Sequence, residues 1–269
     1  MDSDRDVLTA LFDRELREQA RPDGPGVRIE RTADVVRQVG AVDDWNGIVW
    51  SAPGLDPARV DAVIASQVDR YTALGHTEFE WKLYAHDRPD CLARRLRAAG
   101  FEAQEPETVM VARVADLSAA AEPPEGVRLC PVRDADGVEL MARAHERAFG
   151  SDASWLRHRV SALLAGDPDG FVGVLAMAGD EPVSSARMEL YPGTRFAGLW
   201  GGGTAPQWRG RGIYRALVAH RARIAAERGF GFLQVDASGQ SRPILERLGF
   251  LALSTTTPYV FRPHPHRPR

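Results

Sequence analysis

The sequence predicts an α/β protein with a mixed, mostly antiparallel sheet flanked by helices, present as two tandem copies of which the first is truncated. Three observations lead to this class. Strand-like and helix-like segments alternate through both halves of the chain. The end of the first half resembles the end of the second half without a gap. Between the halves, the segment 117–126 gathers small residues and proline and loses periodicity, which predicts a linker.

Composition narrows the possible functions. A chain of 269 residues with 44% hydrophobic content is long and apolar enough for one large or two ordinary folded domains. The 34 basic and 37 acidic residues give a net charge of -3, so we expect no nucleic-acid partner. No apolar run approaches the roughly 20 residues of a membrane span, so we expect a cytoplasmic protein without a membrane partner. Cys91 and Cys130 lie far apart, outside any Cys/His cluster, so we expect no metal site.

The internal repeat joins two segments, RRLRAAGFEAQEPETVMV (94–111) and PILERLGFLALSTTTPYV (243–260). Their shared residues are separated by a constant 149 positions, as 245 − 96 and 260 − 111 show. Asp87 and Asp236, each interpreted as closing an apolar strand, have the same offset. We therefore predict a degenerate first domain (1–116), a linker (117–126), a second domain (127–262) and a disordered tail (263–269). The shared pairs are Leu96/Leu245, Gly100/Gly249, Phe101/Phe250, Thr108/Thr257 and Val111/Val260.

The second half predicts its elements in order. A strand over 126–133 is followed by helices over 134–150 and 151–166. Three antiparallel strands with turns at 179–180 and 192–194 come next. The last of them contains WGGGT, where three successive glycines predict a bulge or a close approach of the backbone. A helix after Gly212, a strand ending near Asp236, a short helix over 241–249 and a closing strand pair complete the half.

The stretch PQWRGRGIYRALVAHRA (206–222) places glycines and arginines at the start of a helix. A helix N-terminus offers unpaired N–H groups and a partial positive charge, which suit a phosphate. Gly210 and Gly212 lack the Cβ atoms that would keep an anion away, while Arg209 and Arg211 add planar donors. We interpret the stretch as a pyrophosphate site. A tight strand-to-helix turn with solvated arginines is the structural alternative.

The pattern Gln207-x-x-Gly210-x-Gly212, after a strand and before a helix, resembles the acyl-CoA signature of the GCN5-related N-acetyltransferases (GNAT). The order of elements over 126–262 is also similar to that family's. The resemblance implies an acyl-CoA N-acetyltransferase fold, acetyl-CoA as cosubstrate and the primary amine of a small molecule or protein as acceptor, in a monomer or homodimer. A noncatalytic acyl-CoA-binding sensor remains an alternative. The implied cofactor-binding residues are Gly203, Thr204, Ala205, Gln207, Arg209, Gly210, Arg211, Gly212, Ile213, Tyr214 and Ser241.

Direct attack on a thioester needs a neutral amine, and therefore usually a base within hydrogen-bond reach. Asp236 is the first candidate for this base, and Glu189 on the preceding strands is the second. Many members of the family carry a proton-donating tyrosine in the late helix, where this chain has Leu245. Tyr259, Ser241 or a water could replace that donor, or the thiolate could leave without one.

The first half lacks the signature. At the corresponding place it reads WSAPGLDPARVDAVIASQV (50–68), in which Pro53 and Pro57 remove backbone donors. Asp56 puts a negative charge where the phosphate would lie. We therefore expect the first copy to lack a cofactor site and to pack against the second.

Overall fold

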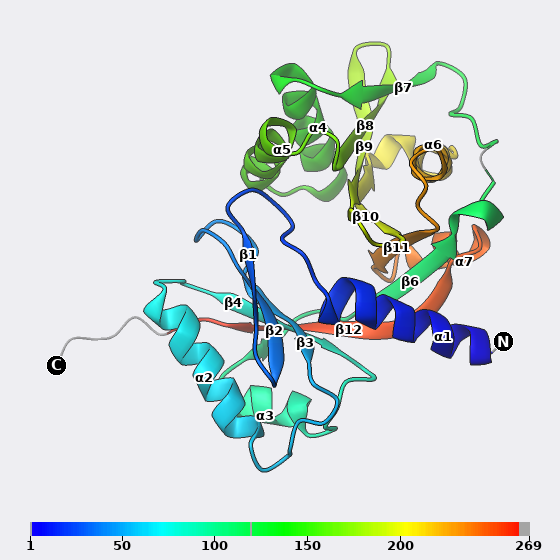
Figure 1. Ribbon diagram of the computed structural model, residues 1–269. Helices are drawn as coiled ribbons and strands as arrows, with labels where there is room; N and C mark the ends of the chain where they lie inside the picture. The colour runs from blue at the N-terminus through cyan, green and yellow to red at the C-terminus, as the bar shows by residue number, and fades with distance from the viewer. Residues whose placement is uncertain (1, 119, 264–269) are drawn as a thin grey trace. The chain divides into compact units, whose positions relative to one another are not determined.

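The computed structural model describes residues 2–118 and 120–263 (Figure 1). The chain forms two compact units. Unit 1 comprises Met1–Val109 and Leu253–Arg269, and unit 2 comprises Met110–Ala252. Apart from residue 263, the predicted disordered tail lies outside the described residues.

Unit 2 is built on a sheet with the strand order β6-β11-β10-β9-β8-β7. The four strands from β7 to β10 pair antiparallel, whereas β10 and β11 pair in parallel. The three-stranded meander predicted from the sequence is β8, β9 and β10, with turns at the predicted positions. The strand bounds are β6 Glu107–Arg113, β7 Val127–Val132, β8 Phe171–Ala178, β9 Glu181–Leu190, β10 Phe196–Thr204 and β11 Phe232–Ala237.

Helices cover both faces of this sheet. Alternate residues of β8 pack on different helices: Phe171 and Leu175 join a cluster with α4 and α5, whereas Val174 joins one with α6. The short helix α7 packs with α6 through Leu245. Asp134 begins α4, because its Oδ1 accepts a hydrogen bond from the main-chain N–H of Gly137 at 2.8 Å. The helices are α4 Ala135–Phe149, α5 Ser154–Gly166, α6 Ile213–Glu227 and α7 Arg242–Arg247.

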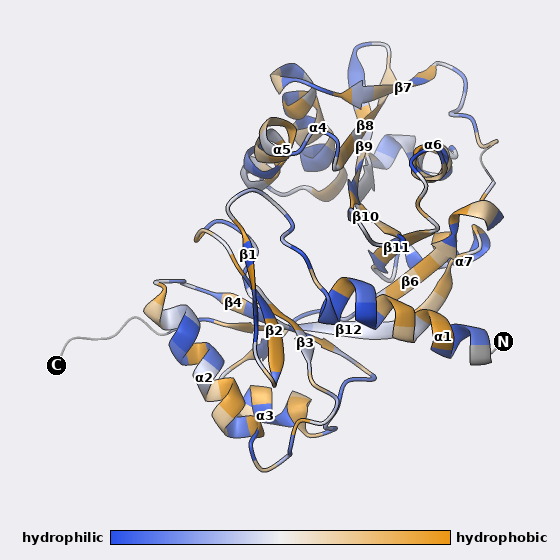
Figure 2. Ribbon diagram, viewed as in Figure 1, coloured by the Kyte–Doolittle hydropathy of each residue, from blue (hydrophilic) through white to orange (hydrophobic). Residues whose placement is uncertain are grey.

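Unit 1 repeats the second part of this plan, with the strand order β1-β2-β3-β4-β12 and β5 paired to β12. Its described residues include no counterpart of β7, α4 or α5, so this copy is truncated as predicted. Helices α2 and α3 pack on the sheet, and α2 mixes hydrophobic and hydrophilic residues along its length (Figure 2). The bounds are α1 Asp2–Phe12, a π-helix Asp13–Glu18, β1 Arg28–Arg31, β2 Val35–Val39, β3 Gly47–Ser51, α2 Val60–Ala73, β4 Phe79–Tyr84, α3 Leu92–Ala98, β5 Glu102–Ala103 and β12 Leu251–Phe261.

Each unit takes its last strand from the other half of the sequence. Strand β12 follows α7 along the chain, yet it pairs with β4 from Thr256↔Tyr84 to Phe261↔Phe79. Strand β6 follows α3, yet its residues Met110 and Ala112 belong to the core of unit 2. Each predicted domain is one continuous segment of the chain, whereas unit 1 combines residues from both ends of it. The reason is that a strand joins whichever sheet buries its apolar residues.

The constant offset of 149 relates α3 to α7 and β6 to β12, but it does not relate Asp87 to Asp236. Asp236 lies inside β11, whereas Asp87 lies beyond the end of β4, in the connection to α3. The interpretation of the two aspartates as equivalent strand ends is therefore wrong. The connection between β4 and α3 spans residues 85–91, whereas that between β11 and α7 spans only 238–241. The offset of 149 that relates α3 to α7 therefore does not relate β4 to β11.

Candidate functional site

Strands β10 and β11 separate part of the way along their length. Their register runs from Phe196↔Phe232 to Gly198↔Gln234, although both strands continue beyond it. Among the described residues, no strand pairs with this edge of β10 after Gly198. On the β9 side, the register shifts between Trp200 and Gly203, which is the bulge predicted from the three glycines. The site therefore has a free main-chain edge next to a bulge.

Each glycine of the triplet lies against a large side chain. A Cβ on Gly201 would come within 2.9 Å of Nη1 of Arg187, and one on Gly202 within 2.8 Å of the Tyr214 ring. A Cβ on Gly203 would collide with the ring of Phe149. Packing by these side chains thus requires glycine here, a reason that sequence reasoning missed.

The predicted phosphate site forms a turn between β10 and α6. Gly210 has φ +75° and Gly212, the N-cap of α6, has φ +85°, conformations that favour glycine. The main-chain N–H groups of Gly210, Arg211 and Gly212 donate no hydrogen bond to any described residue. A Cβ at Gly210 would meet nothing within 4 Å, so the backbone is open on that side. An accessible row of unpaired N–H groups at a helix N-terminus fits a phosphate.

The two arginines of the turn have other contacts. Arg209 donates to the carbonyl oxygens of Thr204 at 3.0 Å and Ala148 at 2.9 Å, so its guanidinium ties α4 and the end of β10 to the turn. The Arg211 guanidinium lies 4.7 Å from the centroid of the Trp208 ring and is exposed. The main chain of the turn, rather than Arg209, is therefore the part suited to phosphate.

The other residues predicted at the cofactor site are placed as follows. Ser184 Oγ donates to the carbonyl of Gly203 at 2.6 Å and lies 2.9 Å from Thr204 Oγ1, while the N–H of Ala205 donates to Val183 at 2.9 Å. These bonds hold the end of β10 on β9. Gln207 is exposed, Ile213 is buried under the sheet, Tyr214 covers Gly202, and Ser241 is the N-cap of α7.

One face of the sheet gathers the polar groups that an amine could meet. Gln234 and Asp236 on β11 alternate with apolar residues, as do Arg187 and Glu189 on β9, and Trp200 of β10 lies between the two strands. Asp236 is half-buried, and its Oδ1 accepts a hydrogen bond from Gln234 Nε2 at 3.0 Å. This carboxylate lies on the part of β11 that has separated from β10.

Glu189 is held by two arginines. Its carboxylate lies 3.1 Å from Nη2 of Arg159, on α5, and 3.3 Å from Nε of Arg187. With its oxygens engaged by guanidinium donors, Glu189 is better placed to position the arginines than to take a proton from an amine. Sequence reasoning missed both arginines. The alternation of polar residues at 185, 187 and 189 was the available signal for Arg187.

The two side chains predicted as proton donors in place of Leu245 lie in different units, Ser241 in unit 2 and Tyr259 in unit 1. Leu245 is fully buried in the core of unit 2. Tyr259 is 3% exposed, lies opposite Trp81 in the register of β12 with β4, and belongs to the core of unit 1. Among the described residues, the structure therefore does not place Tyr259 in the same compact unit as Asp236.

In unit 1, the turn between β3 and α2 corresponds to the predicted phosphate site, but its N–H groups are used differently. There the N–H groups of Leu55 and Arg59 donate to carbonyls within the turn, and that of Ala58 donates to Asp56 Oδ1 at 2.9 Å. These bonds, and the prolines at 53 and 57, leave residues 53–59 without successive unpaired N–H groups that could bind a phosphate.

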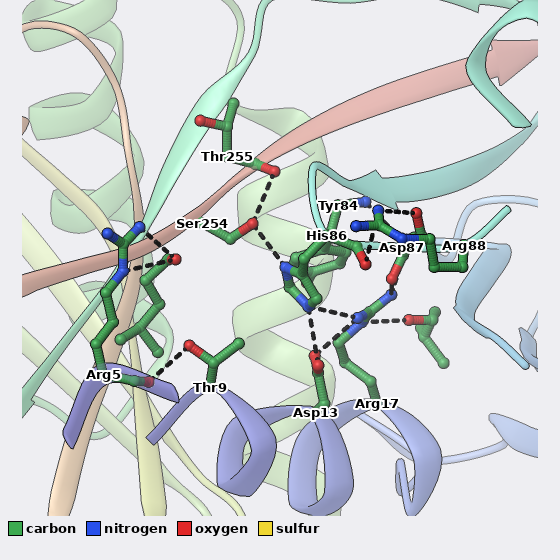
Figure 3. Close-up of polar contacts among 12 residues, drawn as sticks. Arg5, Thr9, Asp13, Arg17, Tyr84, His86, Asp87, Arg88, Ser254 and Thr255 are labelled. Carbon is green, nitrogen blue, oxygen red and sulfur yellow. Dashed lines mark hydrogen bonds and ion pairs between the residues drawn. The ribbon is translucent and has the colours of Figure 1, made fainter. Parts of the chain in front are cut away.

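The space between the separating strands of unit 1 holds an arginine. The register of β3 with β4 ends at Ile48↔Trp81, and Arg17 of the π-helix donates from Nε to the next carbonyl, that of Val49, at 3.0 Å. Its Nη2 donates to both oxygens of Asp87 at 2.7 Å, and its guanidinium lies 3.7 Å from the centroid of the Tyr84 ring (Figure 3).

A second polar chain fixes the same π-helix. His86 lies 2.8 Å from Asp13 through Nε2 and 2.7 Å from Ser254 through Nδ1 (Figure 3). Burial alone would raise the pKa of Asp13, but the hydrogen bond with His86 and the charge of Arg17 outweigh burial and lower it. The charged contacts thus hold the N-terminal segment of unit 1 on the connection that follows β4.

Within the described part of the chain, no helix is long and apolar enough to span a membrane. No group of three or more His, Cys, Asp or Glu side chains among those residues could hold a metal ion.

Comparison with known proteins identifies the fold. Residues 137–250 match the acetyltransferase (GNAT) family. No curated protein matches the chain. A GCN5-related N-acetyltransferase from Kribbella flavida has a TM-score of 0.71 at 20% identity, over 97% of this chain and 96% of that one. A functionally unknown protein from Staphylococcus epidermidis ATCC 12228 reaches 0.69 at 11% identity, covering 96% and 100%.

A tandem GNAT protein from the clavulanic acid biosynthesis pathway has a TM-score of 0.61 at 11% identity, covering 97% of this chain and 94% of that one. The match over 137–250 includes the bulge, the phosphate-site turn and α6. Residues 137–250 thus match the GNAT family, and the chain as a whole shares the fold of tandem GNAT proteins, with a truncated first copy.

Proposed function

We propose that the chain is an acetyl-CoA-dependent N-acetyltransferase that modifies the primary amine of a small molecule or protein. The observation that carries the proposal is the row of unpaired N–H groups at Gly210–Gly212, at the start of α6 and beyond the free edge of β10. The N–H groups would bind the CoA pyrophosphate. The edge would pair with the pantetheine amides as an added strand.

Asp236 is the proposed base. It would take a proton from the ammonium, directly or through a water, so that the nitrogen lone pair can attack the thioester carbonyl. As the new N–C bond forms and the C–S bond breaks, the acylated nitrogen gives up its surplus proton to water, and the CoA thiolate takes up a proton. With a buried leucine at position 245, we propose that a water or Ser241 supplies that proton.

A noncatalytic acyl-CoA sensor is the second candidate, favoured by Leu245 in place of the family's tyrosine. We also propose that only unit 2 binds acyl-CoA, because the turn of unit 1 uses its own N–H groups and Arg17 occupies the space between its strands.

The test is the release of CoA when the full chain is mixed with acetyl-CoA and a panel of amines, alongside calorimetric titration with acetyl-CoA. An enzyme releases CoA in proportion to acetylated amine. Binding without release by any amine supports the sensor, and absence of binding contradicts both candidates.

A further inference from the structure

The acceptor face of unit 2 contains a buried arginine with unused donors. Arg187 is 8% exposed, and its Nε donates to Glu189 at 3.3 Å. Neither of its Nη nitrogens donates a hydrogen bond to any described residue. Burial lowers the pKa of Arg187, which the Glu189 charge opposes. Neither Nη nitrogen is among the fully enclosed polar atoms that lack a partner, so both remain accessible, and a carboxylate would match the planar geometry of the guanidinium.

The charge of Arg187 is not balanced by a carboxylate of its own. Its ion-pair partner Glu189 is shared with Arg159. His145 also faces the group, and burial and the Arg187 charge lower its pKa, which favours the neutral imidazole; a histidine cannot supply a negative charge in either state. The carbonyl of Arg187 accepts from the buried Arg221, another cation, at 2.8 Å.

Arg187 lies close to the place where we propose that acetyl transfer occurs. Its Nη1 lies against Gly201, in the bulge of β10 beside the free edge. Arg187 is opposite Trp200 in the register of β9 with β10. Gly198 is opposite Gln234, so Asp236 lies one alternation further along, level with Trp200 and on the same face. Arg187 and Asp236 thus lie on the two strands that flank β10, on either side of Trp200.

An aromatic surface adjoins the arginine. Trp155, one turn before Arg159 on α5, is 49% exposed, and the Arg187 guanidinium lies 5.5 Å from the centroid of its ring. Its ring also contacts His145 edge-on at 5.6 Å between centroids. An exposed indole beside a cation offers a surface to the apolar part of a small molecule.

We infer that the acceptor is an amine that also carries a carboxylate, such as an amino acid, and that the Nη groups of Arg187 bind this carboxylate. The inference rests on the proposed function and specifies its acceptor. The amine would lie toward Asp236 and the carboxylate toward Arg187, over Trp200. Arg187 is then a residue that determines specificity.

Matched sets of ligands test this with the full chain. Each set contains an amino acid, its amide and its decarboxylated amine: phenylalanine, phenylalaninamide and 2-phenylethylamine, or leucine, leucinamide and 3-methylbutylamine. The amide is less basic and the decarboxylated amine more basic than the amino acid, so a preference over both cannot come from basicity. Calorimetric affinity in the presence of CoA and the KM for CoA release from acetyl-CoA are both measured.

We expect the amino acid to bind roughly tenfold to a hundredfold more tightly than both analogues in at least one set, the range expected for hydrogen bonds to a charged group. Arg187→Gln should remove this preference, and Arg187→Lys should keep only part of it because the planar fork is lost. Arg147→Gln removes an exposed arginine of α4 paired with Glu181, and should leave the preference unchanged. Thermal unfolding and acetyl-CoA affinity verify that the variants are folded.

Equal binding of the three members in every set, including no binding by any, overturns the inference. A preference that persists in folded Arg187→Gln overturns it as well. Preferential binding of amino acids without CoA release from any amine would contradict the proposed function and still support a carboxylate site at Arg187.

Discussion

Three glycines in succession show how much the site depends on small residues. Gly201, Gly202 and Gly203 admit Arg187, Tyr214 and Phe149 against the backbone of β10. Gly210 serves a different purpose, because no side chain lies near it and its backbone is open. The first three glycines shape the strand, and the fourth leaves room for a ligand.

Gly210→Asp should weaken acetyl-CoA binding by tenfold or more. The new side chain strains a backbone with φ +75° and places a carboxylate at the proposed pyrophosphate position. Calorimetry measures the affinity. Gly179→Asp makes the same change at another glycine with positive φ and open surroundings, in the turn between β8 and β9, and should not alter binding. Unchanged affinity in folded Gly210→Asp would contradict the phosphate site.

Asp236→Asn should lower turnover about a hundredfold to ten-thousandfold, the usual cost of removing a positioned base, with acetyl-CoA affinity nearly intact. The substitution preserves shape and the contact with Gln234. Steady-state CoA release with a saturating acceptor measures it, and Asp180→Asn in an exposed turn is the control. Turnover within a factor of a few of the parent would leave Asp236 a structural role and make Glu189→Gln the next variant.

Sequence reasoning anticipated the turn and the bulge of the candidate site, whose conformations are local. Gly210 and Gly212 could be predicted because a turn before a helix has its own sequence pattern, and the bulge because a run of glycines disfavours a regular strand. The Arg159–Glu189–Arg187 group could not, because it depends on where α5 packs against β9. The hydrogen bonds of Arg209 to Ala148 and Thr204 likewise join segments that no local pattern relates.

At the scale of elements, two parallel strands separate in each unit, β10 from β11 in unit 2 and β3 from β4 in unit 1. The groups next to the separated strands differ between the units. In unit 2, no strand among the described residues pairs with this edge of β10 beyond Gly198. In unit 1 the carbonyl of Val49, just beyond the last register pair of β3 and β4, accepts from Arg17. In unit 1, Arg17 of the π-helix thus makes a hydrogen bond to the main chain of β3. In unit 2, we propose that a ligand makes the corresponding contact with β10.

Strands and helix of unit 1 also meet at a charged cluster around Glu30. Hydrogen bonds from Arg70, opposed by burial and reinforced by Arg37, lower the pKa of Glu30 to about 2. Its ordinary value in an unfolded chain is about 4.3. A lowered carboxyl pKa stabilises the fold above the unfolded value, and this contribution disappears as pH falls from about 4.5 toward 2.

Glu30→Gln should therefore reduce the free energy of unfolding at pH 7 and have a progressively smaller effect as pH falls below about 4. Urea denaturation at several pH values measures the difference between parent and variant. Glu246→Gln, an exposed residue paired with Arg242 on α7, should have little effect at any pH. A Glu30→Gln effect that does not change between pH 7 and pH 3 would contradict the lowered pKa.

At the scale of the whole molecule, the exchanged last strands make the two halves depend on each other for folding. Met110 and Ala112 are 0% and 2% exposed in the core of unit 2, and Tyr259 is 3% exposed in that of unit 1. This exchange could not be predicted from the sequence, because β6 and β12 are similar apolar strands and their pairing joins segments more than a hundred residues apart.

Fragments 1–116 and 117–269 should each fail to unfold cooperatively when expressed alone. A fully buried apolar side chain contributes roughly 1.5–3 kcal/mol. Losing several from one core therefore approaches the roughly 5–15 kcal/mol stability of a typical domain. Calorimetric melting measures cooperativity. Coexpression of the fragments should restore it, because each supplies the strand the other lacks. A cooperative transition of 117–269 alone, near that of the full chain, would contradict the exchange.

One acyl-CoA should bind per full chain. Of the two corresponding turns, that of unit 2 presents three successive unpaired N–H groups, whereas in residues 53–59 of unit 1 the prolines and the bonds within the turn interrupt any such row. Calorimetric titration with acetyl-CoA gives the stoichiometry, and Gly210→Asp should abolish or weaken this single event. Saturation at two equivalents would show that the first copy kept a cofactor site.

The position of β12 in unit 1 also sets the order in which the protein can be completed during synthesis. Residues 256–261 pair with β4 but are translated after every other strand of both sheets. The unit that begins first is therefore finished last, and the edge of β4 stays unpaired while the ribosome makes more than 150 further residues. An unpaired edge can recruit strands from other chains. The nascent chain is thus most exposed to misassembly before its last strand is added.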